Sequence, residues 1–274
     1  EPQLLGIWCG KSPDGRNAID KFILIGDHKQ LPAVVLQESS DSEVHADALR
    51  QIGLLNLKDS LFERLYRFHL QETETEVSDM LCKQGRMHPD VAKFANEAFY
   101  AGRLESVGLP HQLELINQPV TFLPSQSDAK YTSIKANQQE AEMAALYAWK
   151  VWEENKDCFD AHHTIGIITP YRNQIALIRK ELEKYGVKEL MDISVDTVER
   201  YQGSERDVII YSFCVNTLSQ LKTLPNLTEE NGVIIDRKLN VALTRARKRL
   251  VIIGNPQLLR EDPIYARLLD SIEK

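Results

Sequence analysis

The four cysteines of this 274-residue chain lie far apart, and no two of them form a CxxC pair. Cys9, Cys82, Cys158 and Cys214 therefore indicate neither a structural zinc site nor a disulfide framework. We predict no metal ligands in this chain. A protein without such a framework fits a reducing compartment, so we expect a cytoplasmic or nuclear location.

Long apolar runs are also lacking. No stretch approaches the ~20 apolar residues that a membrane-spanning helix needs. The N-terminal sequence EPQLLGIWCGK has no basic segment followed by an apolar one, unlike a secretion signal. We therefore expect no membrane partner. The chain does not begin with Met, which is consistent with a fragment of a longer protein.

Basic residues are not in excess, because the net charge is −7. An acidic total argues against a nucleic-acid-binding protein but does not exclude one, since binding requires a local basic groove rather than a basic total. The composition, 43% hydrophobic and 27% charged, is that of a globular protein. Its length allows one large domain or two modest ones.

A complete phosphate-binding loop is lacking as well, although residues 10–12 read GKS. The P-loop motif places four residues between its two glycines. Only three residues separate Gly6 from Gly10, and the turn-forming sequence PDG follows where a helix is required. We interpret GKS as a chance sequence in a loop, and we predict that this chain has no phosphate cradle of its own.

Apolar runs of strand length are present and alternate with helical patterns. The predicted strands are residues 21–27, 163–170, 192–198, 206–213 and 248–255. Their continuous apolar character is typical of parallel strands covered by helices on both faces. Apolar residues recur at helical spacing in residues 137–155 and 171–185. This alternation predicts an α/β fold with a parallel sheet flanked by helices.

Two stretches depart from the alternation. Residues 37–75 begin with the polar run QESSDSEVHAD and continue as the helical pattern SLFERLYRFHLQE. We interpret them as a connector and divide the chain into residues 1–75 and 76–274. Residues 216–233 are predicted to form a surface loop.

Polar side chains lie beside several predicted elements. Gly26 and Asp27 end the first strand, and Gln30 follows in a polar turn. Arg86 precedes a helix that is predicted to begin near Pro89. Each of these positions has a plain structural explanation, such as a strand-end turn or a surface arginine.

Two later segments also carry polar or charged side chains beside predicted strands. Residues 196–205 form a short polar loop between two predicted strands, which we expect at an edge of the sheet. Arg245 and Arg247 lie near the end of a helix that leads into the last strand, where the helix dipole favours cations. None of these segments indicates a function by itself.

Five segments taken together, in this order, resemble the motifs of one family. GDHKQLPA, QGRMHP, TPYRNQ, VDTVERYQGSERDVII and LNVALTRARKRL are similar to motifs III and IV, the segment between IV and V, and motifs V and VI of superfamily 1 helicases. The 1B branch, which includes the nonsense-mediated-decay RNA helicase, is the most similar. The resemblance covers nearly the whole chain.

The resemblance implies a RecA-like fold of the P-loop NTPase type. Residues 76–274 would be the second RecA-like domain, and residues 1–75 the tail of the first. In this family the Walker A and B motifs lie upstream of motif III. The first motor domain would therefore be a partner of this chain and would hold the phosphate cradle and the Mg²⁺ ligands, so this chain alone is not expected to hydrolyse ATP.

The resemblance also implies an ATP site between two such domains. Arg86 and Arg245 would stabilise the charge on the transferring phosphoryl group. Gln30 would sense the γ-phosphate, with Asp27 in the same nucleotide-binding turn. We expect the side chains of this pocket to gather at one edge of the sheet.

The same resemblance implies a role for Glu205 and a second partner. Glu205 would bind the ribose hydroxyls or orient the phosphates, in a loop held by Gln202 and Gly203. Single-stranded nucleic acid would be the second partner.

Four residues match positions along the nucleic-acid path of the family, namely Thr169, Tyr171, Asp196 and Thr197. Threonine hydroxyls can bind phosphate oxygens, and a tyrosine ring can stack on a base without reading sequence. The sequence does not separate DNA from RNA, although we favour DNA slightly.

One position departs from the family. The family has a Tyr that stacks on adenine where this chain has Gly85, so the mode of base binding is left open. A non-catalytic binding module of helicase-like fold is therefore an alternative to a helicase. The presence of Gln30, Arg86, Glu205 and Arg245 counts against it.

Overall fold

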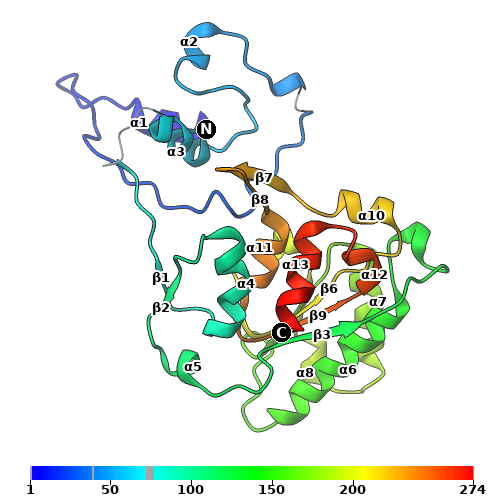
Figure 1. Cartoon of the computed structure of the whole chain (residues 1–274). Helices are drawn as coiled ribbons and strands as arrows, with labels where there is room; N and C mark the ends of the chain where they lie inside the picture. The colour runs from blue at the N-terminus through cyan, green and yellow to red at the C-terminus, as the bar shows by residue number, and fades with distance from the viewer. Residues whose placement is uncertain (1, 39, 72–76, 274) are drawn as a thin grey trace. The chain divides into compact units, whose positions relative to one another are not determined.

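The computed structural model describes residues 2–38, 40–71 and 77–273. It divides into two compact units, Glu1–Leu81 and Cys82–Lys274, which we describe separately (Figure 1). Within the described ranges, no helix combines the length and the apolar character needed to cross a membrane.

The second unit is built on a five-stranded sheet whose neighbouring strands are all parallel. The strand order is β3-β9-β6-β4-β5. The bounds are Val120–Pro124 for β3, Ile165–Ile168 for β4, Ser194–Asp196 for β5, Arg206–Ser212 for β6 and Ala246–Gly254 for β9. This sheet confirms the predicted α/β fold. Three of its strands, β4, β5 and β6, lie within the predicted ranges, and β9 begins two residues before the predicted range 248–255. The edge strand β3 was not predicted.

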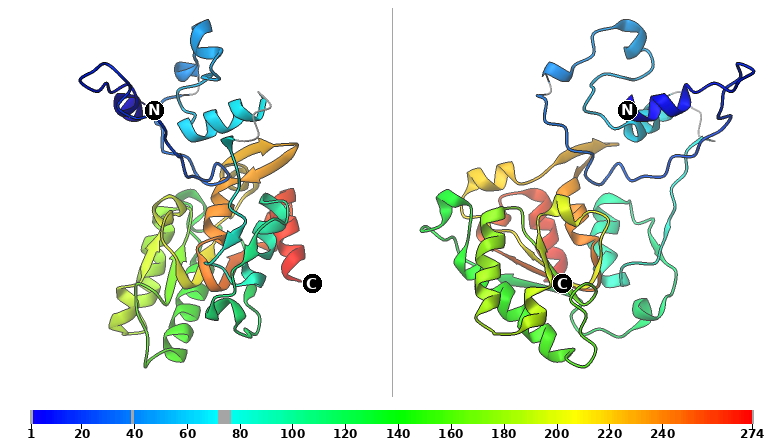
Figure 2. Two further views of the ribbon diagram at one scale, coloured as in Figure 1. Left: turned by 90° about the vertical axis from the view of Figure 1, so that its left-hand side faces the viewer. Right: turned by 180° about the vertical axis from the view of Figure 1, so that it is seen from behind.

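Helices cover both faces of this sheet (Figures 1 and 2). The helices α6, α7 and α8 lie on one side of it, and α4, α11 and α13 lie on the other. Their bounds are Pro89–Phe99 for α4, Gln138–Glu154 for α6, Arg172–Glu183 for α7, Lys188–Met191 for α8, Arg237–Leu243 for α11 and Pro263–Ile272 for α13. The helices α6 and α7 lie within the predicted ranges 137–155 and 171–185, and α4 begins at Pro89 as predicted.

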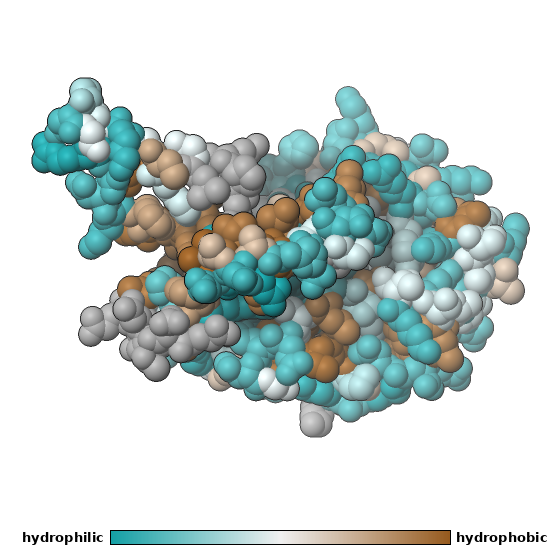
Figure 3. Space-filling model, turned by 90° about the horizontal axis from the view of Figure 1, so that it is seen from above, coloured by the Kyte–Doolittle hydropathy of each residue, from teal (hydrophilic) through white to brown (hydrophobic). Residues whose placement is uncertain are grey.

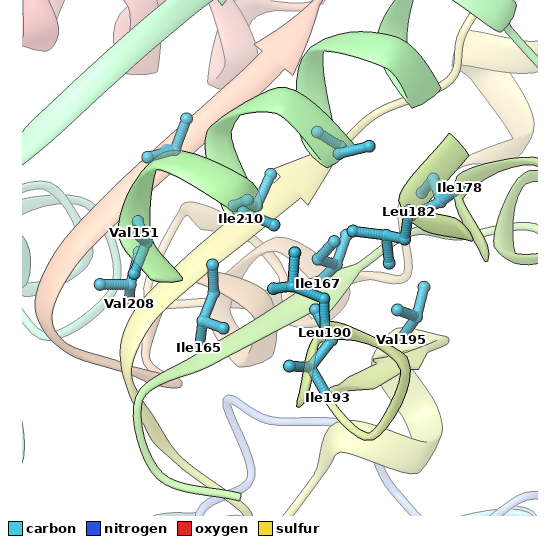
Figure 4. Packing of buried hydrophobic residues seen from close by; sticks show 14 of the residues in the cluster. Val151, Ile165, Ile167, Ile178, Leu182, Leu190, Ile193, Val195, Val208 and Ile210 are labelled. Atoms are coloured by element: carbon cyan, nitrogen blue, oxygen red, sulfur yellow. The ribbon is translucent and has the colours of Figure 1, made fainter. Parts of the chain in front are cut away.

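The core between the sheet and α7 consists of aliphatic side chains. Ile165 and Ile167 of β4 and Ile210 of β6 are fully buried, and they pack in one cluster with Ile178 and Leu182 of α7 (Figure 4). Burying one such side chain stabilises the folded state by about 1.5–3 kcal/mol. This cluster fixes the strands whose ends carry the candidate site.

Small elements connect these layers. Their bounds are Lys83–Gln84 for β1, Glu105–Ser106 for β2, Pro110–Leu113 for α5, Thr132–Ile134 for η3, Val198–Tyr201 for α9 and Pro256–Leu259 for α12. The strands β1 and β2 form a separate parallel pair.

The prediction of a surface loop at 216–233 was wrong. The segment contains the helix α10, Leu218–Thr223, and the strand β7, Leu227–Glu230, which pairs antiparallel with β8, Val233–Asp236. Asn231 and Gly232 both have positive φ, 50° and 77°, which is the two-residue turn geometry that matches strand twist. The strand β7, with the sequence LTEE, has no apolar run, and the run VII of β8 is shorter than that of a buried strand.

The first unit contains short helices and long irregular segments. The bounds are Pro2–Trp8 for α1, Ser40–Ser42 for η1, Asp47–Arg50 for α2 and Leu61–Gln71 for α3. The helix α3 agrees with the predicted helical pattern SLFERLYRFHLQE. The GKS segment lies in a loop, and Gly15 with φ of 81° closes a turn onto the carbonyl of Ser12.

The strand predicted at residues 21–27 is not formed. A β-strand requires a neighbour that pairs with its backbone groups, and no strand among the described residues pairs with this segment. Ile23 and Ile25 are therefore 82% and 86% exposed.

The surface in Figure 3 is mostly hydrophilic, with separate hydrophobic areas.

Candidate functional site

Arg86 lies between β1 and α4, and its guanidinium reaches two other elements. Nε donates a hydrogen bond to Oε2 of Glu205 at 2.6 Å, and Nη1 donates to the carbonyl oxygen of Thr244 at 3.3 Å. The backbone N–H of His88 donates to the carbonyl of Arg247 at 2.7 Å, which fixes the start of α4 against β9. Arg86 is therefore held by contacts over long distances in sequence.

Arg245 follows α11 directly and precedes β9. Its side chain is buried, and all three of its nitrogens have partners: Nε donates to the carbonyl of Val241, Nη1 to the carbonyl of Ser204 and Nη2 to the hydroxyl of Thr244, at 3.1, 3.4 and 3.1 Å. The positions of Arg86 and Arg245 are thus coupled, since both contact Thr244.

Arg247 is a third cation at this place, and it was not among the predicted site residues. Its Nε lies 3.6 Å from Oε1 of Glu205, and its Nη1 lies 3.3 Å from Oδ1 of Asp207. A signal for it was present, because it lies two residues after Arg245 in the motif LNVALTRARKRL. We call Arg86, Arg245, Arg247 and Glu205 the arginine cluster.

The neighbouring arginines change the pKa of the Glu205 carboxyl group. Its partial burial raises its pKa, but the hydrogen bond from Arg86 and the charges of Arg86, Arg247 and Arg245 outweigh that effect and lower the pKa below its usual range. Glu205 is therefore ionised at neutral pH. It offsets part of the positive charge of the cluster.

The loop before Glu205 also contains two predicted site residues. Gln202 directly follows α9 and is exposed. Gly203 has φ of 89°, a conformation that a residue with Cβ adopts only with strain, and a Cβ there would meet open space. The glycine therefore serves the turn itself, which brings Glu205 to the arginines.

The predicted nucleic-acid residues lie elsewhere. Thr169 follows β4, Asp196 ends β5, and the N–H of Thr169 donates to the carbonyl of Asp196 at 3.1 Å. Asp196 accepts a hydrogen bond from the N–H of Thr197 at 2.8 Å. Tyr171 immediately precedes α7. These residues share the edge at which the strands end, which we call the carboxyl edge.

The arginine cluster and the predicted nucleic-acid residues lie at opposite edges of the sheet. Glu205 precedes β6 and Arg245 precedes β9, so the arginine cluster lies at the amino edge, where the strands begin. The polar loop 196–205 spans both edges, because a connection between parallel strands must return from the end of β5 to the start of β6. The two groups of predicted residues are therefore separate sites.

Thr169 and Tyr171 differ in their access to solvent. Thr169 is fully buried, and its hydroxyl has no hydrogen-bond partner among the described residues. Tyr171 is partly exposed, and burial raises the pKa of its phenol, so the ring is neutral at physiological pH. Tyr171 can contact a ligand directly, whereas Thr169 contacts one only after its surroundings move.

Asp27 and Gln30 lie in the first unit and form one turn. Oδ2 of Asp27 accepts a hydrogen bond from Nε2 of Gln30 at 2.8 Å, and the carbonyl of Asp27 accepts one from the N–H of Gln30 at 3.1 Å. The helix α3 supports this turn, since a Cβ on Gly26 would lie 3.2 Å from the ring of Phe62 and His28 stacks on Tyr66. The structure thus brings the two predicted residues together.

Gly85 lies beside two aliphatic side chains. A Cβ at Gly85 would lie 3.2 Å from Cδ1 of Leu109 and 3.5 Å from Cγ2 of Val107. Both side chains are partly exposed, at 42% and 48%. A larger residue at this position would have to displace the flexible end of Leu109.

A buried carboxyl group was missed by sequence reasoning. Glu140 of α6 is fully buried, and it accepts hydrogen bonds from the hydroxyls of Ser125 and Ser212 and from the N–H of Cys214, at 3.0, 2.7 and 2.8 Å. Burial raises its pKa to about 7. Its place on the apolar stripe, one turn before Ala144, was the signal available.

Metal ligands do not gather in the described parts of the chain. No group of three or more histidine, cysteine or acidic side chains within residues 2–38, 40–71 and 77–273 is placed to hold an ion. The arginine cluster instead suits an anion, because its three guanidinium groups outnumber the two carboxyl groups beside them, those of Glu205 and Asp207.

The sequence of this chain is similar to those of known proteins. Residues 57–257 match the family model described as AAA domain. The chain is 32% identical to Helicase sen1 of Schizosaccharomyces pombe over 93% of this chain and 14% of that protein. It is 31% identical to an uncharacterized ATP-dependent helicase of Methanocaldococcus jannaschii over 91% of this chain and 34% of that protein.

A third relative is a Regulator of nonsense transcripts 1 homolog from Arabidopsis thaliana, 30% identical over 92% of this chain and 19% of that protein. The chain thus spans about a third or less of the length of these relatives. The family match covers most of the chain, and the relatives carry helicase names. The chain belongs to the AAA domain family, and its ordered motifs are those of superfamily 1B helicases of the nonsense-mediated-decay type.

Proposed function

We propose that this chain is the C-terminal motor part of an ATP-dependent helicase or translocase. It would bind the phosphates of ATP at the arginine cluster and single-stranded nucleic acid at the carboxyl edge. The observation that supports this most is that Arg86 and Arg245 both contact Thr244, because two guanidinium groups then lie beside the same residue.

The chemistry of the cluster suits phosphoryl transfer. A guanidinium presents donors in a rigid fork that matches phosphate oxygens. Arg245 is held by three hydrogen bonds and is 2% exposed, so its surroundings would have to move before it contacts a bound phosphoryl group. Arg86 is one-third exposed and can turn from Glu205 toward a ligand.

Nucleotide hydrolysis would then require ATP, Mg²⁺ and a second domain. The described residues offer cations for phosphate but no set of ligands for the metal, so the metal ligands and the phosphate cradle would lie in the first motor domain. Mg²⁺ neutralises phosphate charge in such enzymes. Asp27 would hold Gln30 in place as a sensor of the γ-phosphate.

Glu205 would have two roles. In the ligand-free chain it keeps Arg86 and Arg247 ordered by ion pairing. When ATP binds, the carboxylate would accept hydrogen bonds from the ribose hydroxyls, while the turn at Gln202 and Gly203 keeps it at the cluster.

Nucleic acid would contact the carboxyl edge through Tyr171, Asp196 and Thr197. The ring of Tyr171 can stack on any base, and the Thr197 hydroxyl can bind a phosphate oxygen, which gives binding without sequence readout. The buried Thr169 would support this edge rather than touch the strand. DNA remains slightly favoured over RNA in this proposal.

The test is ATPase activity in two forms of the protein. The chain alone should release no phosphate from ATP, with or without nucleic acid. Joined to a domain that carries a complete phosphate cradle, it should hydrolyse ATP, and Arg86→Ala should reduce turnover by about 10³–10⁵-fold. Robust turnover by the isolated chain, or full activity of the Arg86→Ala form, would contradict the proposal.

A non-catalytic binding module is the second candidate, and Gly85 is the observation that favours it, because no aromatic residue is available at that position to stack on adenine. The same experiment separates the two. A joined protein that binds nucleic acid but hydrolyses no nucleotide would support the binding module.

A further inference from the structure

A short loop between β3 and α6 carries two lysine–tyrosine pairs. Nζ of Lys130 lies 5.1 Å from the ring centroid of Tyr131, and Nζ of Lys135 lies 5.2 Å from the ring centroid of Tyr171. The second pair joins this loop to the carboxyl edge, because Tyr171 follows β4. Two pairs of basic and aromatic side chains therefore involve this loop, in a chain whose net charge is −7.

The backbone at Lys135 is held in an uncommon conformation. Lys135 has φ of 55° and ψ of 53°, in the left-handed region, where residues other than glycine are rare. Such strain persists only where the surrounding structure enforces it, and it is frequent at binding sites. The exposed side chain of Lys135 is thereby directed over the ring of Tyr171.

Three contacts from the carboxyl edge enforce this conformation. Nδ2 of Asn173 donates to the carbonyl of Ile134 at 2.6 Å, and the thiol of Cys214 donates to the carbonyl of Lys135 at 3.4 Å. Oε1 of Gln174 accepts from the N–H of Asn137 at 2.8 Å. Helix α7 and the segment after β6 thus both hold the loop in place.

Asp128, the acidic residue of this loop, is hydrogen-bonded to backbone N–H groups. Asp128 accepts hydrogen bonds from the N–H groups of Lys130, Tyr131 and Gln138, at 3.0, 3.3 and 3.0 Å. These bonds shape the turn that precedes Lys135. No ion pair between Lys135 and a carboxylate is present among the described residues, so its ammonium group is available to an anionic ligand.

We propose that Lys135 and Tyr171 together form a binding site for one nucleotide of single-stranded nucleic acid. The ammonium group of Lys135 binds the phosphate, and the ring of Tyr171 stacks on the base. This assignment of Lys135 rests on the proposed function, in which Tyr171 contacts nucleic acid. It adds the residue that would supply the electrostatic part of that contact.

The test measures binding of a fluorescent single-stranded 15-mer to the chain by anisotropy, from 50 to 200 mM salt. Lys135→Asn removes the charge but keeps a residue that tolerates positive φ. We expect it to weaken binding several-fold and to lower the salt slope by about 1. Lys135→Arg keeps the charge and should retain both the affinity and the slope.

Lys156 provides a matched control. Its Nζ lies 4.9 Å from the ring centroid of Trp152, so it forms a pair of the same kind, but it follows the C-terminal end of α6, toward the amino edge. Lys156→Asn should bind like the unchanged chain. Tyr171→Leu should weaken binding about tenfold while leaving the salt slope unchanged, and Tyr171→Phe should retain binding.

The outcomes distinguish this inference from the proposed function. If the unchanged chain binds and Lys135→Asn binds equally well with the same salt slope, the role of Lys135 is wrong and the proposed function stands. If the unchanged chain binds no oligonucleotide at 50 mM salt, both are wrong. Melting curves of the Lys135 variants show whether a loss of binding reflects loss of folding.

Discussion

Arg86 and Glu205 are 119 positions apart in the chain, yet their side chains are joined by a hydrogen bond of 2.6 Å. This ion pair occupies the guanidinium that we propose for phosphate binding. Because both side chains are substantially exposed, the pair contributes at most ~1 kcal/mol to stability. Its consequence is greater for ligand binding, since an incoming anion competes with Glu205 for Arg86.

Glu205→Gln tests this competition. The variant removes a negative charge from the arginine cluster, so we expect inorganic tripolyphosphate, which has no ribose, to bind several-fold more tightly. Isothermal titration calorimetry of the two chains measures the difference. Glu154→Gln is the control, because Glu154 is exposed and pairs with Arg249 away from the cluster. Weaker tripolyphosphate binding by Glu205→Gln would show that the carboxylate does not oppose anions at this site.

Arg245→Ala should affect both stability and turnover. The side chain is 2% exposed, and its removal takes away one buried donor each from the carbonyls of Val241 and Ser204, which should destabilise the fold by about 1–3 kcal/mol. Turnover of the protein joined to a first motor domain should fall by about 10³–10⁵-fold.

Arg249 is the matched control for this change. It lies on β9, the strand that Arg245 directly precedes, and it pairs with Glu154 at the surface. Arg249→Ala should therefore cost about 0.5 kcal/mol or less and leave turnover unchanged. Denaturant unfolding and ATPase assays measure the two effects. Equal losses of turnover in both variants would contradict a specific role for Arg245.

The sequence predicted four of the five strands of the central sheet, including the edge strand β5, but not the edge strand β3. The strands β4, β6 and β9 are buried on both faces, so they read as apolar runs, whereas the edge strand β3 is only partly buried and lies between Pro119 and Pro124. The segment 21–27 shows the opposite failure, since its apolar pattern is clear but no partner strand is present among the described residues.

The candidate site was predicted residue by residue but not in its arrangement. Family motifs indicated Arg86, Glu205 and Arg245, and the structure brings these side chains together. The predicted strand ranges already put Thr169 at the end of one strand and Glu205 before the start of another, so the separation of the two edges could have been predicted from a parallel sheet. Glu140 was missed because a glutamate within an alanine-rich helix is ordinarily exposed.

Gly166→Ala tests a close contact within the core. Gly166 lies in β4, and a Cβ there would collide with the hydroxyl of Tyr201, which is itself buried and donates to the carbonyl of Ser194. We expect the variant to be destabilised by about 1–3 kcal/mol through overpacking, as measured by denaturant unfolding.

Tyr201→Phe should relieve part of that collision, because it removes the oxygen that the new Cβ meets. The double variant should therefore be more stable than Gly166→Ala alone. If the double variant is no more stable, the destabilisation does not arise from this contact.

The buried carboxyl of Glu140 predicts an unusual pH dependence. Its pKa is about 7 in the folded chain against an ordinary value of 4.5, so between these values the folded state binds the proton and the unfolded state does not. This group therefore stabilises the fold fully below about pH 4.5, and its contribution is lost as the pH rises to about 7. The change amounts to at most ~3 kcal/mol.

Glu140→Gln separates this effect from other titrations. Glutamine stays neutral, so the difference in unfolding free energy between the variant and the unchanged chain should shift in favour of the variant from pH 5 to pH 8. Denaturant unfolding at several pH values measures that difference. The direction follows from burial, which opposes the charged form more than the hydroxyls of Ser125 and Ser212 and the N–H of Cys214 support it. A difference that is constant over this range would show that Glu140 is ionised throughout and that its three donors outweigh its burial.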